Sequence, residues 1–309
     1  MLGVRCRGRA SLLVHAPVSS RTTSGILVGL IAFVSWGIVP LYWKLIDDVS
    51  ADRIVSHRAI WCLVFLAFVV MLSSAKRAAV REALQRPRSV AYSALAGWLI
   101  GINWLIYIWA VIRGHVIEAS LGYFLSPLVT VALGALVLGE RLPTLRWVAV
   151  VLAATGVMFK VVLHGTVPWI ALSLCTTWGS YALVKRLAGL DSITGLFLES
   201  IAILPPALLY LAFLLGADSG PGFVAGWPRV PLLLIGGGVV TAVPLLCYAY
   251  ATRRLTLATL GLMQYLTPTM TFLLGVFLYR EPFAGTDLIT FGCIWAGLML
   301  YSASSSETP

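Results

Sequence analysis

Charged side chains are scarce in this 309-residue sequence. Asp, Glu, Lys and Arg together make up 11%, whereas 60% of the residues are hydrophobic and the mean hydropathy is +0.94. Soluble domains contain about 25% charged and about 45–50% apolar residues. This shortage of charge excludes a soluble globular domain, because so much apolar surface needs lipid as its solvent. We expect an all-α integral membrane protein.

Motifs for metals, disulfides and catalysis are also lacking. The five cysteines show no CxxC or Cys/His spacing, so we expect no metal site, no cofactor and no disulfide framework. No Ser/His, HExxH or paired-carboxylate arrangement indicates an enzyme, and no GxxxxGK[ST] sequence indicates an ATPase. The net charge of +10 does not predict a nucleic-acid partner, because the Lys and Arg residues lie mainly in loops between apolar runs.

Apolar runs fill the chain from Gly25 to Ala303. A spanning helix needs about 20 mostly apolar residues, and turn residues divide the runs into ten transmembrane helices. We place them at 25–46, 52–73, 90–112, 116–138, 143–163, 167–186, 193–215, 229–251, 257–279 and 283–303. Residues 1–24 and 304–309 are expected to be cytoplasmic tails, although the Arg- and Ser-rich first tail also resembles a transit peptide.

The distribution of positive charge predicts the orientation of the helices. With the N terminus inside, fifteen of the 22 Lys and Arg residues fall on the cytoplasmic side. Cytoplasmic loops carry an excess of these residues. We therefore expect a multi-pass protein of the inner (cytoplasmic) membrane with both termini in the cytoplasm.

The sequence contains an internal repeat. A shift of 141 residues aligns 107–140 with 248–281, with ten identities in 34 positions. The matched pairs include Pro127 over Pro268 and Glu140 over Glu281. This alignment predicts two five-helix repeats, at 25–163 and 164–303, and the odd helix number makes them inverted. Inverted repeats are typical of secondary transporters, although shared membrane composition is an alternative source of the Leu, Gly and Ala matches.

Polar and aromatic residues at membrane depth are the candidates for function, since a charge at the helix centre costs about 2.5–3.5 kcal/mol. The candidates for gating or coupling are Lys44, His57, Arg58, Lys185 and Glu199. The candidates for substrate binding are Trp36, Asn103, Trp104, Tyr107, Tyr123, Ser126, Trp178, Tyr248, Gln264 and Thr267. We expect helix kinks, with carbonyl groups released toward a cavity, at Pro127, Pro244 and Pro268.

Each assignment has a structural alternative. The side chains of Lys44 and Lys185 also suit snorkelling to the interface. The amides and prolines also suit a kinked packing helix held by interhelical hydrogen bonds, and the deep tryptophans also suit ordinary packing. Trp43 is interpreted as part of the interfacial aromatic belt.

Several stretches together match a known pattern. They are Trp36 to Lys44, His57 to Trp61, Asn103 to Val111, Gly114 to Phe124, Asp191 to Gly195, Glu199, Thr241 to Leu245, Arg253 to Arg254 and Gln264 to Phe283. With them the chain resembles the RarD family, in the EamA branch of the drug/metabolite transporter superfamily. The resemblance implies ten spans, two EamA repeats and a permease in a bacterial cytoplasmic membrane. The chain departs from the family pattern at Ile112, Arg113 and Ser126.

The sequence thus predicts a secondary-active permease that moves a small metabolite or drug by alternating access. Its expected partners are a small-molecule substrate, membrane lipids and a coupling proton or cation, the proton being carried by Glu199 or His57. The alternatives are a membrane scaffold or sensor without flux and an intramembrane lipid-modifying enzyme. Substrate identity, direction of transport and oligomeric state are not predicted.

Overall fold

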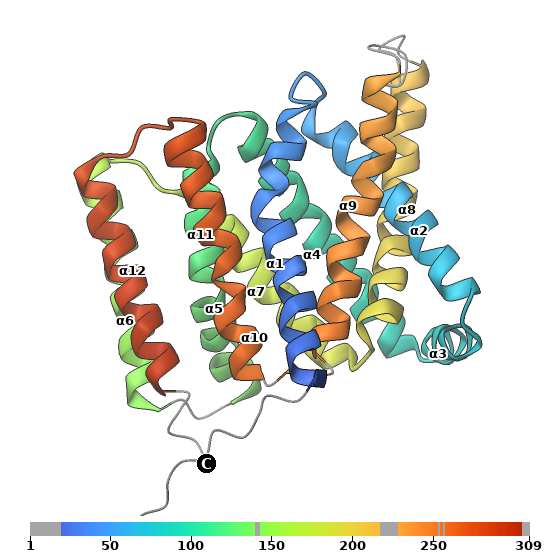
Figure 1. Ribbon diagram of the computed structural model, residues 1–309, viewed down its shortest axis with the longest axis horizontal. Helices are drawn as coiled ribbons and strands as arrows, with labels where there is room; N and C mark the ends of the chain where they lie inside the picture. The colour runs from blue at the N-terminus through green and yellow to red at the C-terminus, as the bar shows by residue number, and fades with distance from the viewer. Residues whose placement is uncertain (1–19, 140–142, 217–227, 253, 256, 305–309) are drawn as a thin grey trace, which may run out of the picture.

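A computed structural model describes residues 20–139, 143–216, 228–252, 254–255 and 257–304. These residues form helices and connecting loops, with no strand among them. In chain order the helices are α1 (Ser20–Lys44), α2 (Ala51–Met71), α3 (Ser74–Leu84), α4 (Pro87–Ile112), α5 (Val116–Leu138), α6 (Thr144–His164), α7 (Trp169–Ala188), α8 (Ser192–Gly216), α9 (Arg229–Thr252), α10 (Leu257–Gln264), α11 (Leu266–Leu273), the π-helix η1 (Leu274–Leu278) and α12 (Gly285–Ser304). Apart from α3, they stand side by side as a bundle (Figure 1).

Seven helices of the described chain are long and apolar enough to cross a membrane: α1, α2, α4, α5, α6, α8 and α9. The expectation of an all-helical, multi-pass membrane protein is therefore confirmed. Helical structure also occupies the remaining predicted ranges, as α7, as the consecutive α10, α11 and η1, and as α12. Most of the expected N-terminal tail, the last five residues and Glu140 lie outside the described residues.

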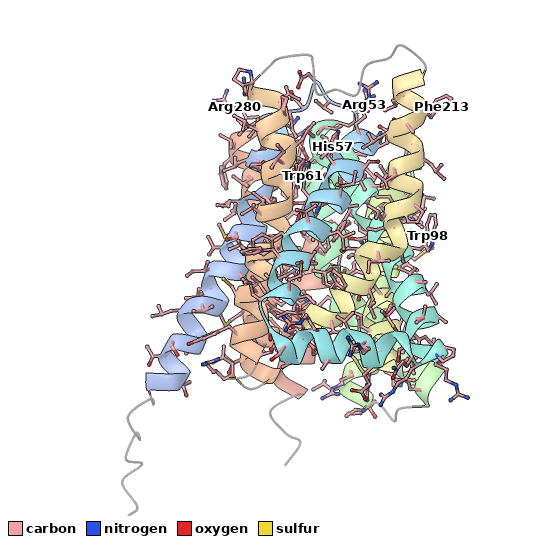
Figure 2. The ribbon with its side chains drawn as sticks, turned by 90° about the vertical axis from the view of Figure 1, so that its right-hand side faces the viewer. Arg53, His57, Trp61, Trp98, Phe213 and Arg280 are labelled. Atoms are coloured by element: carbon pink, nitrogen blue, oxygen red, sulfur yellow. The ribbon has the colours of Figure 1, made fainter. Side chains whose placement is uncertain are left out.

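Apolar side chains cover the outside of the bundle as well as its inside. Trp98 is 50% exposed and Phe213 is 70% exposed, and both point away from the helices in Figure 2. In water, exposed apolar surface of this extent would drive association. Lipid contact accounts for it, because hydrocarbon tails solvate such side chains.

The helix α3 was not predicted from the sequence. It lies at the lower right of the bundle in Figure 1, seen nearly end-on, at the same end as the start of α1. The hydroxyl of Ser73 accepts a hydrogen bond from the backbone N–H of Lys76 and so caps the first turn. Val80 and Ala83 are buried and pack with Val70 and Leu198. The helix is thus amphipathic, with one face on the bundle and a basic face outside.

Lys76 of α3 also forms an ion pair with Asp191, just before α8. Burial of the Asp191 carboxyl opposes its ionisation, but hydrogen bonds from Lys76 and Thr194 outweigh this effect and lower its pKa below 3.8. Asp191 accepts hydrogen bonds from the backbone N–H groups of Ile193 and Thr194, at 3.2 and 3.3 Å. One carboxylate therefore caps α8 and anchors α3.

Glycines let neighbouring helices approach closely. A Cβ atom at Gly238 of α9 would lie 2.6 Å from the backbone carbon of Trp61 on α2, and one at Gly97 of α4 would lie 2.6 Å from the carbonyl oxygen of Glu199 on α8. Small residues at helix interfaces are the usual basis of close packing in membranes. At Gly97 this close packing places the turn of α8 that carries the buried Glu199 directly against α4.

Candidate substrate-binding site

Asn103 is the centre of a hydrogen-bond network between three helices. Its amide nitrogen donates to the carbonyl of Leu174 at 3.1 Å and to the hydroxyl of Thr177 at 2.8 Å. Its amide oxygen accepts from the hydroxyl of Tyr123 at 3.0 Å, and the side chain is 0% exposed. Because both ends of the amide are engaged, Asn103 holds α4, α5 and α7 together in this conformation.

Aromatic rings extend this network along the bundle. The ring of Tyr107 lies 5.4 Å from that of Tyr123, which lies 5.9 Å from that of Trp178. Trp178 in turn lies 5.7 Å from Tyr181. The structure thus brings four of the predicted substrate-binding residues together, namely Asn103, Tyr107, Tyr123 and Trp178.

Glu199 is paired inside the bundle. Its carboxylate accepts hydrogen bonds from the ammonium of Lys185 and from the hydroxyl of Tyr181, both at 2.9 Å. The Glu199 side chain is 2% exposed, whereas that of Lys185 is 26% exposed. A buried charge is tolerated when it is paired and hydrogen-bonded. The two predicted gating residues of the second half therefore form one unit, and Tyr181 joins it to the aromatic series.

Arg58 has aromatic neighbours. Its guanidinium carbon lies 4.0 Å from the ring centre of Trp104 and 5.5 Å from that of Trp43. The Arg58 residue is 9% exposed and Trp43 is 1% exposed. Trp43 therefore does not belong to an interfacial aromatic belt, as its sequence position had indicated, because the face of α1 that carries it turns into the bundle.

A second group lies between α1 and α9. The ring of Trp36 is 5.9 Å from that of Tyr248, and both rings are within 6 Å of Phe33. The hydroxyl of Thr267 donates to the carbonyl of Phe33 at 2.9 Å. Trp36, Tyr248 and Thr267 are thus brought together, but in a cluster distinct from that of Asn103.

The three predicted kinks differ in outcome. The helices α5 and α9 continue through Pro127 and Pro244, whereas the helix before Pro268 is interrupted between Gln264 and Leu266. A proline removes the hydrogen bond to the carbonyl four residues earlier, which here is that of Gln264. The structure places Gln264 at this interruption.

The remaining predicted residues have local partners or lie toward the bundle end. The hydroxyl of Ser126 donates to the Gly122 carbonyl of its own helix at 2.9 Å. Lys44 donates to the carbonyl of Ile112 at 3.2 Å, at the C-terminal end of α4. His57 is buried on α2 and lies in the upper part of the bundle in Figure 2.

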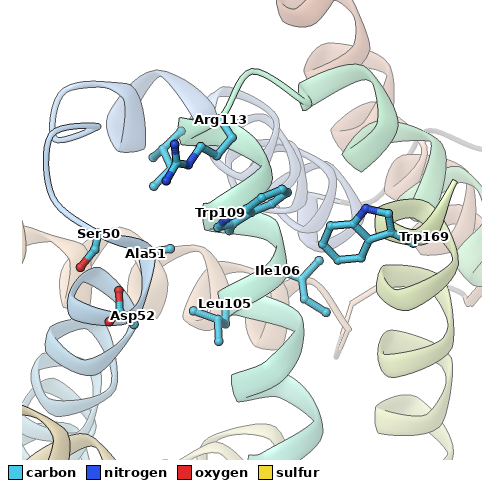
Figure 3. A pocket seen from close by; sticks show the side chains of 9 residues that line it. Ser50, Ala51, Asp52, Leu105, Ile106, Trp109, Arg113 and Trp169 are labelled. Atoms are coloured by element: carbon cyan, nitrogen blue, oxygen red, sulfur yellow. The ribbon is translucent and has the colours of Figure 1, made fainter.

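A pocket of about 420 Å³ opens between the start of α2, the last turns of α4 and the start of α7. Figure 3 shows Trp109 and Trp169 at its wall, with Arg113 above them; the two indole rings are 5.3 Å apart. None of the predicted site residues lines this pocket. It is therefore separate from the polar network inside the bundle.

Sequence reasoning did not select Thr177, Tyr181 or Trp43. Tyr181 lies four residues before Lys185, so helical spacing places both on one face, and this was the available signal. Thr177 is adjacent to Trp178 but contacts Asn103 through tertiary packing alone. For Trp43, its distance from the helix end suggests an interfacial position, but the direction of its side chain depends on how α1 packs in the bundle.

Comparisons with known proteins give a consistent result. The model of the EamA-like transporter family matches twice, at residues 23–162 and 166–303. An "uncharacterized transporter" of Vibrio cholerae is 42% identical over 286 residues, covering 93% of this chain and 94% of the relative. "Protein RarD" of Escherichia coli is 41% identical over 285 residues, covering 92% of this chain and 95% of the relative.

More distant relatives agree. The "chloramphenicol-sensitive protein RarD" of Pseudomonas aeruginosa is 30% identical, covering 92% of this chain and 95% of the relative. One solved crystal structure shares the fold with a TM-score of 0.59 at 19% identity, covering 93% of this chain and 100% of its own. From these matches the chain belongs to the EamA-like transporter family, and within it to the RarD-type permeases.

Proposed function

We propose that this protein is a secondary-active permease that moves a small metabolite or drug across the bacterial inner membrane by alternating access. The observation that carries the proposal is the series of contacts from Asn103 through the part-buried Tyr123 and Trp178 to the buried Tyr181 and Glu199, which connects helices of both halves. Polar groups are rare at this depth unless they serve packing or transport.

The proposed architecture is ten spans in two inverted repeats, 25–163 and 164–303. Two separate matches to one family model, at 23–162 and 166–303, support this division. Packing also supports it, because α5 and α4 of the first half lie against α7 and α8 of the second. In alternating access, such a central interface is exposed to each side in turn as the halves rock.

The proposed orientation puts both termini in the cytoplasm. The basic helix α3 lies at the end of the bundle where α1 begins, as Figure 1 shows. Its residues Lys76, Arg77 and Arg81 belong to the excess of positive charge that is typical of the cytoplasmic side. With this orientation the Lys185–Glu199 pair faces the cytoplasmic half and Lys44 the opposite end.

The pair of Lys185 and Glu199 is proposed as a gate, and Glu199 or His57 as the site of a coupled proton. A gate requires an interaction that is made in one conformation and lost in another. The pair meets the first condition, since it joins α7 to α8 at 2.9 Å. Its partner Tyr181 gives the gate direct contact with the aromatic series.

The test is substrate counterflow in proteoliposomes. Purified protein is first screened by thermal shift against amino acids, nucleosides, sugars and amphiphilic drugs, because a ligand of the folded state raises its apparent stability. Compounds that bind are then loaded into vesicles, and uptake of the labelled compound is measured. We expect counterflow with the wild type and with Glu82→Ala, an exposed control on α3, and its loss with Glu199→Ala.

One outcome contradicts the permease and another contradicts the gate. A compound that stabilises the protein but shows no counterflow favours a sensor or scaffold. Counterflow that is unchanged in Glu199→Ala contradicts the gating role of the Lys185–Glu199 pair but still supports a permease.

A further inference from the structure

The charge of Arg58 is not balanced within the described chain. The buried acidic residues there are Glu199 and Asp287. Glu199 pairs with Lys185, and Asp287 pairs with Lys160 at 2.8 Å. Among the described residues no carboxylate forms an ion pair with Arg58, although the residue is 91% buried, being 9% exposed. A buried cation without a counterion is costly, so this position suits a ligand that supplies the negative charge.

Hydrogen-bond donors without acceptors accompany this charge. The Nε atom of Arg58 and the Nε1 atom of Trp43 are both buried, and neither has a hydrogen-bond partner in the described part of the chain. The Trp43 ring centre lies 5.5 Å from the guanidinium carbon. Unpaired buried donors are uncommon in native proteins. One of these donors belongs to the guanidinium itself and the other to the indole beside it, and together they indicate a site for an anionic acceptor.

The surroundings restrict the kind of anion. The guanidinium plane presents a fork of donors that matches the two oxygens of a carboxylate. One guanidinium balances one negative charge, whereas a phosphate monoester carries about −1.5 to −2 at neutral pH and would leave an excess. The neighbours of the guanidinium are apolar and aromatic: the ring centre of Trp104 lies 4.0 Å from its carbon atom, and Tyr107 belongs to the same buried cluster as Trp43.

We propose that Arg58 and Trp43 bind the carboxylate of an apolar monocarboxylate, and that this is the substrate class of the permease. That the acid is a transported substrate rests on the proposed function, whereas the anion site itself rests on the contacts of Arg58. The apolar body of the ligand then packs on Trp104 and Tyr107, next to the Asn103 network.

The test compares acids with their neutral counterparts. Thermal shift and isothermal calorimetry are carried out at pH 7 with benzoate, phenylacetate and 3-phenylpropionate, and with the three matching carboxamides. At this pH the acids are ionised, and the amides keep nearly the same size and shape. We expect at least one acid to bind and stabilise the wild type, and its amide to bind at least about tenfold more weakly, because the charge-assisted pair is lost.

Variants locate the binding. Arg58→Gln is expected to abolish acid binding, and Arg58→Lys to weaken it about tenfold by removing the fork while keeping the charge. Trp43→Phe keeps a ring but removes the Nε1 donor and is expected to weaken binding about threefold to tenfold. Arg88→Gln removes an exposed positive charge and is expected to leave acid binding unchanged. If Arg58→Gln does not fold, the Lys and Phe variants decide the question.

The outcomes separate this inference from the permease proposal. Equal binding of an acid and its amide, acid binding that survives in all three site variants, or no binding of any acid overturns the anion site. Counterflow of a neutral compound that is indifferent to Arg58→Lys, with no counterflow of an acid, overturns the substrate class while supporting the permease. Arg58-dependent acid binding without acid counterflow supports the site and contradicts the permease.

Discussion

The carboxylate of Glu281 accepts hydrogen bonds from the backbone N–H groups of Val116 and Ile117, at 2.7 and 2.8 Å. A residue from the loop between η1 and α12 thereby caps α5, more than 160 positions away in the chain. The first N–H groups of a helix have no partner within it, and a negative charge there also interacts favourably with the helix dipole.

Glu281→Ala is therefore expected to destabilise the protein by about 0.5–2 kcal/mol, the range for a lost helix cap. Glu281→Gln keeps one acceptor oxygen, so its stability is expected to lie between that of the wild type and that of Glu281→Ala. The measurement is thermal unfolding in detergent. Glu82→Ala is the control, because Glu82 is 63% exposed in its ion pair with Arg86 and such pairs contribute little. An effect of Glu281→Ala no larger than the control's contradicts the capping role.

Gly238→Ala is expected to lower the melting temperature. The added methyl would meet the Trp61 backbone at 2.6 Å, so α2 and α9 would have to separate. Gly292→Ala on α12 is the matched control, because nothing lies within 4 Å of a Cβ there. Alanine is favoured over glycine inside a helix by about 1 kcal/mol, so the control is expected to be neutral or stabilising. Equal melting temperatures for the two variants would rule out close packing at Gly238.

The ion pair of Lys76 and Asp191 gives a prediction for pH. The pKa of Asp191 is lower in the folded protein than its ordinary value of 3.8. A lowered carboxyl pKa stabilises the folded state above the unfolded-state value, and this contribution is lost as pH falls through the folded-state value. The melting temperature of the wild type should thus exceed that of Asp191→Asn by a constant amount between pH 5 and pH 7. The gap should close below about pH 4.

Lys76→Met provides the complementary measurement for this ion pair. It removes the cation but keeps the Asp191 carboxylate as the cap of α8. Its melting temperature should be less dependent on acid pH than that of the wild type. A gap between wild type and Asp191→Asn that persists unchanged to pH 3 would contradict the assignment.

The network of Asn103 is expected to be cooperative. Asn103→Ala leaves the hydroxyls of Tyr123 and Thr177 without their amide partner, and Tyr123→Phe leaves the amide oxygen without its donor. Each unsatisfied buried group costs about 1–3 kcal/mol. The double variant should therefore cost less than the sum of the single variants, as a double-mutant cycle in denaturant shows. Strict additivity would mean that the two side chains do not interact.

Proton coupling is tested on the two titratable candidates. In vesicles, Glu199→Gln or His57→Gln is expected to remove the pH dependence of transport, because neither glutamine exchanges a proton. Tyr181→Phe keeps the Glu199 carboxylate and should keep that dependence. If both glutamine variants insert normally into the membrane and their transport keeps its full dependence on pH, the coupled proton is carried by another residue.

The sequence was sufficient for the positions of the apolar helices, because a continuous apolar run fixes where a chain enters lipid. It was not sufficient for α3, because this helix is amphipathic, too short and too polar to appear as an apolar run. Spacing placed Asn103 and Tyr107 on one face of α4, but the contact with Thr177 depends on how α4 meets α7. The lack of a counterion for Arg58 could not be predicted either, because it depends on which acidic residues pair with other cations in the folded chain.

The interruption at Tyr265 has a mechanical consequence. The eight residues of α11 lie between this interruption and the π-helix η1, two places where regular helical bonding changes. Within α11, Thr267 and Thr271 donate to the carbonyls of Phe33 and Gly37 on α1, at 2.9 and 3.5 Å. The short helix is therefore hydrogen-bonded to α1 as well as to its own continuation, so a displacement of α1 would pull on α11 and bend the chain at the two places where the regular helical bonding changes.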